Sequence, residues 1–276
     1  MPTVLVNGVS IAYSDTGIPE GRDSAETIVF GHGLLFGGWM FDPQVEALRQ
    51  RYRCVTIDWR GQGDTPPTSD GYDMDTLTAD AVGLIGALRL APVHFVGLSM
   101  GGFIGLRLAA RHPELLRSLT LLDTSAAQED SAKIGEYKRL ALAVRVFGFR
   151  AVQRQVAPHM FGPAFRADPG ARPIIRDWAA RLRRHDRAAL RRAVLGVADR
   201  RPVESELAGI TLPTLVLVGA DDTATPPARA REIITRIPGS RLAVIEQCGH
   251  SSTLEQPRSV TGHLTDFLAA SASPLI

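Results

Sequence analysis

The sequence predicts an α/β fold whose core is a mostly parallel, eight-stranded sheet with helices on both faces. Short apolar runs alternate along the chain with stretches whose apolar residues recur at helical spacing, and this rhythm is typical of parallel sheets. Most of the apolar runs are continuous, as expected of strands that are covered on both faces. The predicted strands are residues 3–6, 9–13, 27–30, 53–57, 93–96, 118–122, 214–218 and 241–245.

The first two strands are predicted to form a hairpin. Asn7-Gly8 separates residues 3–6 from residues 9–13, and this dipeptide favours a two-residue type I′ turn. Because the strands of a hairpin run antiparallel, this pair is the exception in the predicted sheet.

Helical spacing is clearest in residues 75–88. Leu77, Ala81 and Leu84 fall on one helical face, and Asp75 is the expected N-cap. The other helices predicted for the core are residues 41–51, 102–111, 227–237 and 257–269.

The alternation of strands and helices breaks between residues 127 and 207. This stretch is rich in arginine, has a helical pattern with Pro and Gly punctuation, and contains no strong strand. It is too long for a loop, so it predicts a helical cap inserted into a core made of residues 1–126 and 208–276. We expect its arginines to form a solvated outer face. Examples are Arg181, Arg183, Arg184, Arg191 and Arg192.

The composition is that of an ordinary globular protein. The chain has 276 residues, of which 45% are hydrophobic and 22% charged, enough for one large α/β domain. A net charge of +2, without basic blocks that alternate with aromatic residues, argues against a nucleic-acid partner. No apolar stretch is long enough to cross a membrane, no signal peptide is evident, and cysteines are few. We therefore expect a cytoplasmic protein with a small-molecule substrate, and leave open whether it forms a homo-oligomer.

A serine between two glycines follows the strand at residues 93–96. Gly97 and Gly101 flank Ser99, and a helix is predicted to begin immediately afterwards. A serine on a sharp strand-to-helix turn projects from the backbone and can attack a carbonyl carbon. Such a turn leaves no room for a Cβ atom at the flanking positions. The pattern predicts that Ser99 is a nucleophile.

A nucleophilic serine needs a base that removes its proton. His250 lies just after the last predicted strand, at the edge of the sheet where the parallel strands end, so we expect it to be that base. His32 also follows a strand, but it precedes Gly33 in a turn and is expected to brace that loop. The histidines considered are His32, His94, His112, His159, His185, His250 and His263.

The base in turn needs an acid that orients it. Asp222 is favoured because it follows the strand at residues 214–218, with Asp221 and Asp123 as alternatives. The resulting order along the chain is Ser99, Asp222, His250, as is usual for a serine on a strand-to-helix turn. The backbone amides of Leu34 and Met100 are expected to form the oxyanion hole.

No cofactor or metal is expected. The polar, glycine-containing loop at residues 58–65 is not followed by the Gly-Lys-Ser/Thr of a phosphate-binding loop. No histidine pair has ligand spacing and no cysteine cluster exists. Cys54 and Cys248 are interpreted as small core residues.

These motifs resemble those of the α/β-hydrolase superfamily over essentially the whole chain. Within it, the sequence is similar to capped esterases and to 3-oxoadipate enol-lactonase-like serine hydrolases. In the family's Gly-x-x-Asp pattern the fourth position is the acid, which implies Asp222, and a serine at position 99 argues against the haloalkane dehalogenase and epoxide hydrolase branches. The matching pieces are His32-Gly33, residues 58–65, Gly97 to Gly102, Gly219 to Asp222 and Gly249-His250.

The expected function is hydrolysis of carboxylic esters or lactones through an acyl-enzyme on Ser99. Activity should fall at low pH as His250 becomes protonated, near its reference pKa of about 6.5. The residues expected to line an apolar substrate pocket under the cap, with core packing as the alternative for each, are Leu34, Phe36, Trp39, Met160, Phe161 and Trp178.

Two alternatives are kept. The same triad could support carbon–carbon bond hydrolysis or perhydrolysis, which assays on vinylogous diketones and on peroxide–acetate mixtures would detect. A hydrolase-derived small-molecule receptor would bind its ligand tightly and turn over far below about 1 s⁻¹ on every ester tried.

Overall fold

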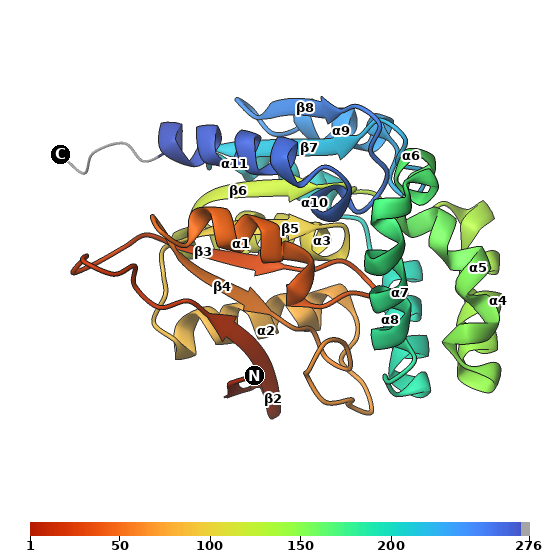
Figure 1. Cartoon of the computed structure of the whole chain (residues 1–276). Helices are drawn as coiled ribbons and strands as arrows, with labels where there is room; N and C mark the ends of the chain where they lie inside the picture. The colour runs from red at the N-terminus through yellow and green to blue at the C-terminus, as the bar shows by residue number, and fades with distance from the viewer. Residues whose placement is uncertain (272–276) are drawn as a thin grey trace.

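The computed structural model describes residues 1–271 and contains one eight-stranded sheet with helices on both faces (Figure 1). The order across the sheet is β1-β2-β4-β3-β5-β6-β7-β8. β2 runs antiparallel to β1 and β4, and every other pair is parallel, which confirms the predicted α/β fold. The strands are β1 (Thr3–Val6), β2 (Val9–Asp15), β3 (Thr27–Gly31), β4 (Arg53–Ile57), β5 (Val93–Leu98), β6 (Leu116–Leu122), β7 (Thr214–Gly219) and β8 (Arg241–Ile245).

The helices of the core form two layers, and each layer buries its own hydrophobic cluster against the sheet. One face is covered by α1 (Asp42–Leu48) and α11 (Pro257–Ser271), which pack on each other. The opposite face is covered by α2 (Met74–Ala87), α3 (Met100–Arg111) and α9 (Pro227–Ile234). Burial of both sheet faces explains why the strand sequences are continuously apolar.

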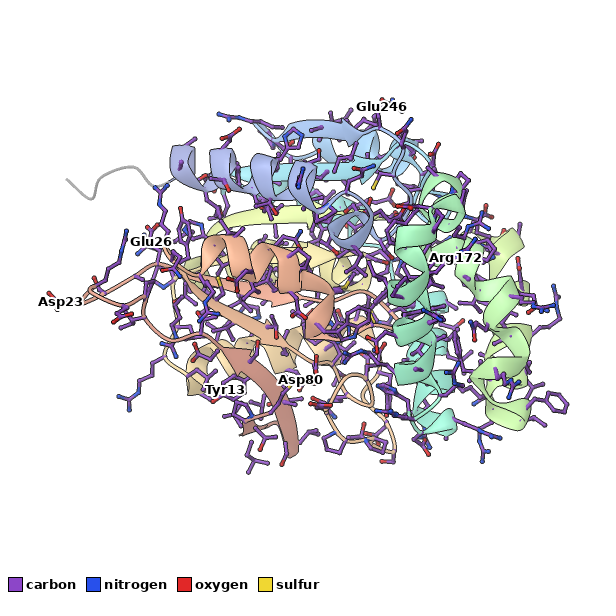
Figure 2. All side chains as sticks on the ribbon, viewed as in Figure 1. Tyr13, Asp23, Glu26, Asp80, Arg172 and Glu246 are labelled. Atoms are coloured by element: carbon purple, nitrogen blue, oxygen red, sulfur yellow. The ribbon has the colours of Figure 1, made fainter. Side chains whose placement is uncertain are left out.

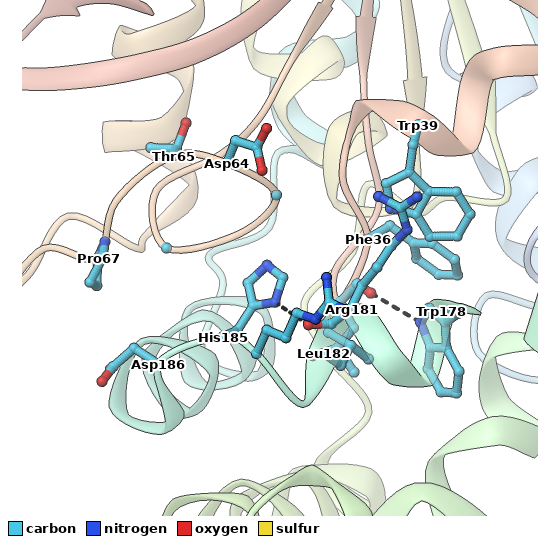
Figure 3. A pocket seen from close by; sticks show the side chains of 14 residues that line it. Phe36, Trp39, Asp64, Thr65, Pro67, Trp178, Arg181, Leu182, His185 and Asp186 are labelled. Carbon is cyan, nitrogen blue, oxygen red and sulfur yellow. Dashed lines mark hydrogen bonds between the residues drawn. The ribbon is translucent and has the colours of Figure 1, made fainter. Parts of the chain in front are cut away.

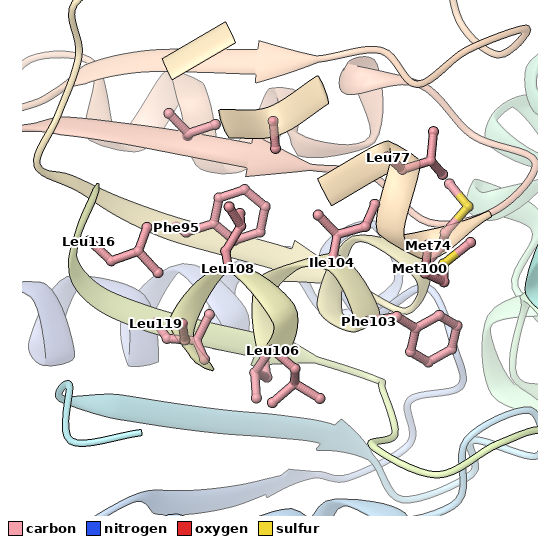
Figure 4. Close-up of a cluster of buried hydrophobic side chains, with 14 of the residues drawn as sticks. Met74, Leu77, Phe95, Met100, Phe103, Ile104, Leu106, Leu108, Leu116 and Leu119 are labelled. Atoms are coloured by element: carbon pink, nitrogen blue, oxygen red, sulfur yellow. The ribbon is translucent and has the colours of Figure 1, made fainter. Parts of the chain in front are cut away.

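Helix α3 packs closely on the strand that precedes it (Figure 4). A Cβ atom added at Gly105 of α3 would lie 3.1 Å from the side chains of both Phe95 and Leu119. Ile104 and Leu108 of the same helix are fully buried in this cluster. Because β5 and α3 are both fixed by the core, the turn between them is held on rigid elements on both sides.

All five predicted core helices differ at one or both ends from the observed ones. α1 follows a 3₁₀ turn at Gly38–Phe41 and ends at Leu48, and α9 ends at Ile234. The expected N-cap of α2 is wrong. Asp73 caps this helix by accepting a hydrogen bond from the Thr76 amide at 2.9 Å, whereas Asp75 lies in the first turn and pairs with arginines of α3.

Between β6 and β7 the chain forms five α-helices and contains no strand. They lie beyond the carboxyl ends of the parallel strands (Figure 1). Arg181, Arg183 and Arg184 are exposed, as is Arg172 (Figure 2). Arg191 and Arg192 are half-buried and not part of the expected solvated face, and Arg192 donates to the Thr68 carbonyl at 3.2 Å. The helices are α4 (Ser131–Phe147), α5 (Phe149–Met160), α6 (Pro163–Ala167), α7 (Arg172–Leu182) and α8 (Arg187–Ala198).

Among the helices of residues 1–271, none is long and apolar enough to span a bilayer. The remaining short helices are α10 (Ser252–Glu255) and the 3₁₀ turns Pro113–Leu115, Pro169–Ala171 and Glu204–Gly209.

Candidate active site

Ser99 occupies a strained turn between β5 and α3. Its φ angle is +52°, a region that residues other than glycine seldom adopt, and its amide donates a hydrogen bond to the Leu122 carbonyl at 2.8 Å. A Cβ atom added at Gly97 would lie 2.3 Å from the Gly101 carbonyl oxygen, and one at Gly101 would lie 1.9 Å from that of Gly31. Close backbone packing therefore requires glycine on both sides of the serine.

Ser99, His250 and Asp222 form one hydrogen-bonded chain. His250 Nε2 lies 2.9 Å from Ser99 Oγ, although the two residues are 151 positions apart in the sequence. His250 Nδ1 lies 2.8 Å from Asp222 Oδ2. Because a carboxylate can only accept, Nδ1 carries the proton that is donated to Asp222, and Nε2 is left to accept from the serine hydroxyl. All three side chains are buried.

The Asp222 carboxylate is fully hydrogen-bonded. Its Oδ1 accepts from the amides of Ala224 at 2.8 Å and Thr225 at 3.0 Å. Its Oδ2 accepts from the Thr225 hydroxyl at 2.8 Å as well as from His250. Thr225 is a residue of this network that was not predicted from the sequence, although a threonine three residues after an aspartate in a loop is a recognisable turn signal.

The two other acid candidates do not contact His250. Asp221 is exposed to solvent. Asp123 is fully buried, and its carboxylate accepts from the Gly219 amide at 2.9 Å and from the Ser252 amide at 3.4 Å. Burial, followed by the nearby charge of Asp222, raises the pKa of Asp123 to about 8. A group that favours its neutral form near pH 7 is poorly suited to stabilise an imidazolium ion.

The pKa of His250 lies above its ordinary value of 6.5. Burial alone would lower this pKa, but the charge of Asp222 and the hydrogen bond to it raise it, with further contributions from Asp123 and Glu255. The net direction is set by the carboxylate at 2.8 Å, because an opposite charge in contact favours the protonated imidazole.

The loop after β3 is braced next to the serine. His32 is fully buried, its Nδ1 lies 2.7 Å from the Gly33 carbonyl oxygen, and its Nε2 accepts from the Trp59 amide at 3.1 Å. A Cβ atom added at Gly33 would lie 3.5 Å from the Cβ of Ser99. This contact places Leu34, the following residue, at the mouth of the site, and Met100 opens α3 on the other side.

A largely apolar cavity of about 80 Å³ opens beside Ser99 and His250. Leu34 of the core loop and Met160 of α5 line it, as the sequence analysis predicts. Most of the other walls come from the helical segment, and its α4 residues recur at helical spacing. The wall residues from α4 are Tyr137, Leu140, Ala141 and Val144, those from α5 are Phe149, Val156 and His159, and those from α8 are Val194 and Val197. The rest of the lining consists of Leu35, Phe103, Glu129, Ala224 and Thr225.

Four of the expected pocket residues lie elsewhere, which corrects the sequence-based expectation. Phe161 and Trp178 are fully buried and pack edge to face with ring centroids 5.2 Å apart, and the Phe36 ring lies 6.1 Å from that of Trp178. Phe36, Trp39 and Trp178 line a separate cleft with Arg181 (Figure 3). These four aromatic side chains were expected in the cavity because of their apolar surface, but they lie where the helical segment packs on the core.

The side chains of residues 1–271 that could bind a metal ion are not clustered. Within residues 1–271, no three histidine, cysteine, aspartate or glutamate side chains are grouped to hold one. Cys54 and Cys248 are buried free thiols, and burial raises the pKa of each. Neither thiol is therefore ready to act as a nucleophile or ligand.

Comparison with known proteins assigns the chain to a family. The profile of the family described as "alpha/beta hydrolase fold" matches residues 26–257. The crystal structure of the enol-lactonase from Burkholderia xenovorans LB400 superposes with a TM-score of 0.89, at 28% identity, over 97% of this chain and 100% of that one.

Two sequence relatives carry names from different substrate classes. 3-oxoadipate enol-lactonase 2 from Acinetobacter baylyi is 28% identical over 93% of this chain and 92% of its own length. "Putative carbamate hydrolase RutD" from Stutzerimonas stutzeri is 29% identical over 89% of this chain and 92% of its own length. The family match covers most of the chain, and the enol-lactonase structure superposes over nearly all of it. The chain therefore belongs to the α/β-hydrolase fold family.

Proposed function

We propose that this protein is a serine hydrolase that cleaves carboxylic esters or lactones. The observation that carries the proposal is the chain of contacts from Ser99 Oγ through the His250 imidazole to Asp222, at 2.9 and 2.8 Å. A hydroxyl, a base and an orienting acid at these distances are the parts that acyl transfer needs. The enol-lactonase name of the structural neighbour supports an ester or lactone as substrate.

In the proposed mechanism, His250 Nε2 takes the proton of Ser99 as its Oγ attacks the carbonyl carbon. The imidazolium that forms is stabilised by Asp222, and it then gives its proton to the leaving alkoxide. With a lactone, the alcohol that is released stays attached to the acyl group. Water, activated by the same histidine, hydrolyses the acyl-enzyme and restores the serine hydroxyl.

The oxyanion is proposed to bind the backbone amides of Leu34 and Met100. Neither amide has a hydrogen-bond acceptor among the contacts of residues 1–271, so both are free to donate. Met100 is the first residue of α3, where the helix dipole adds positive potential. Removing one such donor in a serine protease costs about 3 kcal/mol of transition-state stabilisation.

The cavity beside Ser99 is proposed to hold a small, uncharged acyl group, and helices α4, α5 and α8 act as the cap above it. Its volume of about 80 Å³ is small, and its walls are mainly aliphatic and aromatic. Glu129 is the acidic residue of the wall, but its oxygens already accept from Arg200 Nη1 at 2.8 Å and from the Asp130 amide at 3.0 Å. Glu129 and Arg200 thus satisfy each other, and Glu129 has no free negative charge that would recognise a cationic acyl chain.

A larger side chain in this cavity should shorten the acyl group that is accepted. Ala141 lies on the wall and is 1% exposed, so Ala141→Phe should lower the ratio of kcat/KM for p-nitrophenyl butyrate to that for the acetate by about 10-fold or more. Ala132→Phe is the control, because Ala132 is exposed on the same helix. An unchanged ratio in Ala141→Phe would place the acyl group elsewhere.

The pH dependence should report His250. The base works only when neutral, so activity is lost as pH falls through the pKa of His250. Because the pKa of His250 is raised, kcat/KM should fall to half its maximum at a pH above 6.5. This midpoint is higher than the one expected from the reference pKa of histidine alone. A stopped-time assay from pH 5 to 9 measures it, and a midpoint well below 6.5 would contradict the assigned charge on Asp222.

The proposal as a whole is tested with a panel of p-nitrophenyl esters and aliphatic lactones. Turnover of at least one class, absent in Ser99→Ala, is expected. Tight binding of every ester without turnover would instead favour a receptor built on this fold.

A further inference from the structure

Glu255 is a buried carboxylate that the proposed mechanism does not use. It lies at the end of α10, only 8% of its surface is exposed, and it forms no ion pair with any lysine or arginine in residues 1–271. An ionisable side chain in this position needs compensation from its surroundings. All three hydrogen bonds that its carboxylate accepts come from backbone amides.

The amides that Glu255 binds come from two distant parts of the chain. Its Oε2 accepts from Gly249 at 2.8 Å and its Oε1 from Ser251 at 3.0 Å, the two residues on either side of His250. Its Oε2 also accepts from Gly162 at 3.0 Å, in the junction between α5 and α6. One carboxylate therefore joins the histidine loop to the helical segment above the site.

Two further contacts hold the same segments together. The Ser251 hydroxyl donates to the carbonyl of Met160, the last residue of α5, at 2.6 Å. A Cβ atom added at Gly249 would lie 2.2 Å from the Gly162 nitrogen, and one at Gly162 would lie 2.7 Å from the Gly249 nitrogen. The two backbones are thus in direct contact, with no side chain between them.

The chemistry of the three partners explains why a carboxylate is needed. All of them are N–H donors, and only an ionised carboxylate offers acceptors on both of its oxygens. Burial raises the pKa of Glu255, while the three amide bonds and the charge of His250 oppose this rise. A glutamine has the same shape but would turn an NH₂ group toward one of the amides.

We propose that Glu255 is a positioning residue that fixes the position of the His250 imidazole through Gly249 and Ser251. Because Glu255 also binds Gly162, this position depends on how the α5–α6 junction packs against the histidine loop. The inference rests on the proposed function for its kinetic consequence. Met160 also lines the cavity beside Ser99. Movement of this junction during substrate entry would therefore shift the His250 loop through the contacts of Glu255 and Ser251.

The test compares Glu255→Gln with Glu246→Gln. Glu246 is an exposed acid on the loop that carries His250 (Figure 2), so its variant removes one negative charge without removing a buried contact. The first measurement is the pKa of His250 by NMR of its imidazole protons. The titratable groups that act on this ring are Asp222, Asp123 and Glu255. Glu255→Gln should lower this pKa because one negative neighbour is lost, and Glu246→Gln should leave it unchanged.

The second measurement is the rate at which a fluorophosphonate modifies Ser99. The labelling rate is measured as a function of pH. On its high-pH plateau, misplacement of the base should slow labelling about 10- to 100-fold in Glu255→Gln. The fall in labelling rate at acid pH should also move to lower pH in this variant, because the pKa of His250 is lowered. A residue that only stabilises the fold would reduce the folded fraction without moving the pH at which labelling falls. Unchanged labelling and an unchanged His250 pKa in folded Glu255→Gln would overturn the proposal.

A third variant covers the case in which Glu255→Gln does not fold. Ser251→Ala removes the contact with Met160 but keeps every charge, so labelling should slow while the His250 pKa stays the same. Labelling at the wild-type rate would overturn the proposed coupling. If wild-type protein is not labelled at all, the proposed function fails, but the NMR titration still decides whether Glu255 controls His250.

Discussion

Ser99→Ala should abolish covalent labelling by a fluorophosphonate and lower kcat on the best ester by about 10⁶-fold. The reason is that Ser99 Oγ is the atom to which His250 Nε2 is hydrogen-bonded, and no other hydroxyl contacts this nitrogen among the hydrogen bonds of residues 1–271. Intact-protein mass spectrometry measures the adduct, and peptide mapping assigns it.

The effect should be specific to position 99. The variant removes only the hydroxyl, so the strained turn and its hydrogen bond to Leu122 are retained and the thermal stability should stay close to that of the wild type. Ser69→Ala, on an exposed loop, serves as the control and should label normally. An adduct that persists in Ser99→Ala, at whatever residue, would show that the nucleophile is misassigned.

Asp222→Asn should lower kcat by about 10⁴-fold, with the fold preserved. The expected reason lies in the partners of the two oxygens. Oδ1 accepts from two backbone amides, so the amide oxygen of asparagine will take that position and leave its NH₂ group facing His250 Nδ1. The imidazole must then accept at Nδ1 and carry its proton on Nε2, where it cannot take the proton of Ser99.

Two controls separate the acid candidates. Asp221→Asn alters an exposed side chain and should leave kcat within a factor of about two, since it changes only a solvated charge. Asp123→Asn removes a buried carboxyl that contacts backbone amides but not His250. Near-normal turnover in Asp222→Asn, together with a large loss in Asp123→Asn, would transfer the orienting role to Asp123.

The cleft lined by Trp39 and Arg181 is separate from the cavity beside Ser99, although Leu35 borders both. The Arg181 guanidinium lies 4.9 Å from the centre of the Trp39 ring, and Trp178 donates its indole N–H to the Leu35 carbonyl at 3.0 Å. These contacts tie α7 to the loop after β3. They explain why aromatic residues near the site can support its walls without lining it.

Much of the strand and helix pattern could be predicted from local sequence. Residues 53–57 and 241–245 are strands with the predicted bounds, because a continuous apolar run between turn signals is a short-range property. The cap of α2 could not be predicted as well, since Asp73 and Asp75 are equally plausible in isolation. Asp75 is drawn instead to Arg107 and Arg111 of the neighbouring helix, at 3.0 and 2.8 Å.

The sequence by itself determined the α/β class of this protein, the glycine-flanked turn at Ser99 and the strand ends at which His250 and Asp222 appear, because each depends on a few adjacent residues. Only the tertiary structure decided which carboxylate meets the imidazole, which side chains face the cavity, and that Glu255 joins Gly162 to Gly249. These contacts depend on the order of strands in the sheet and on how side chains of helices distant in sequence fill the same space, and no local pattern encodes either.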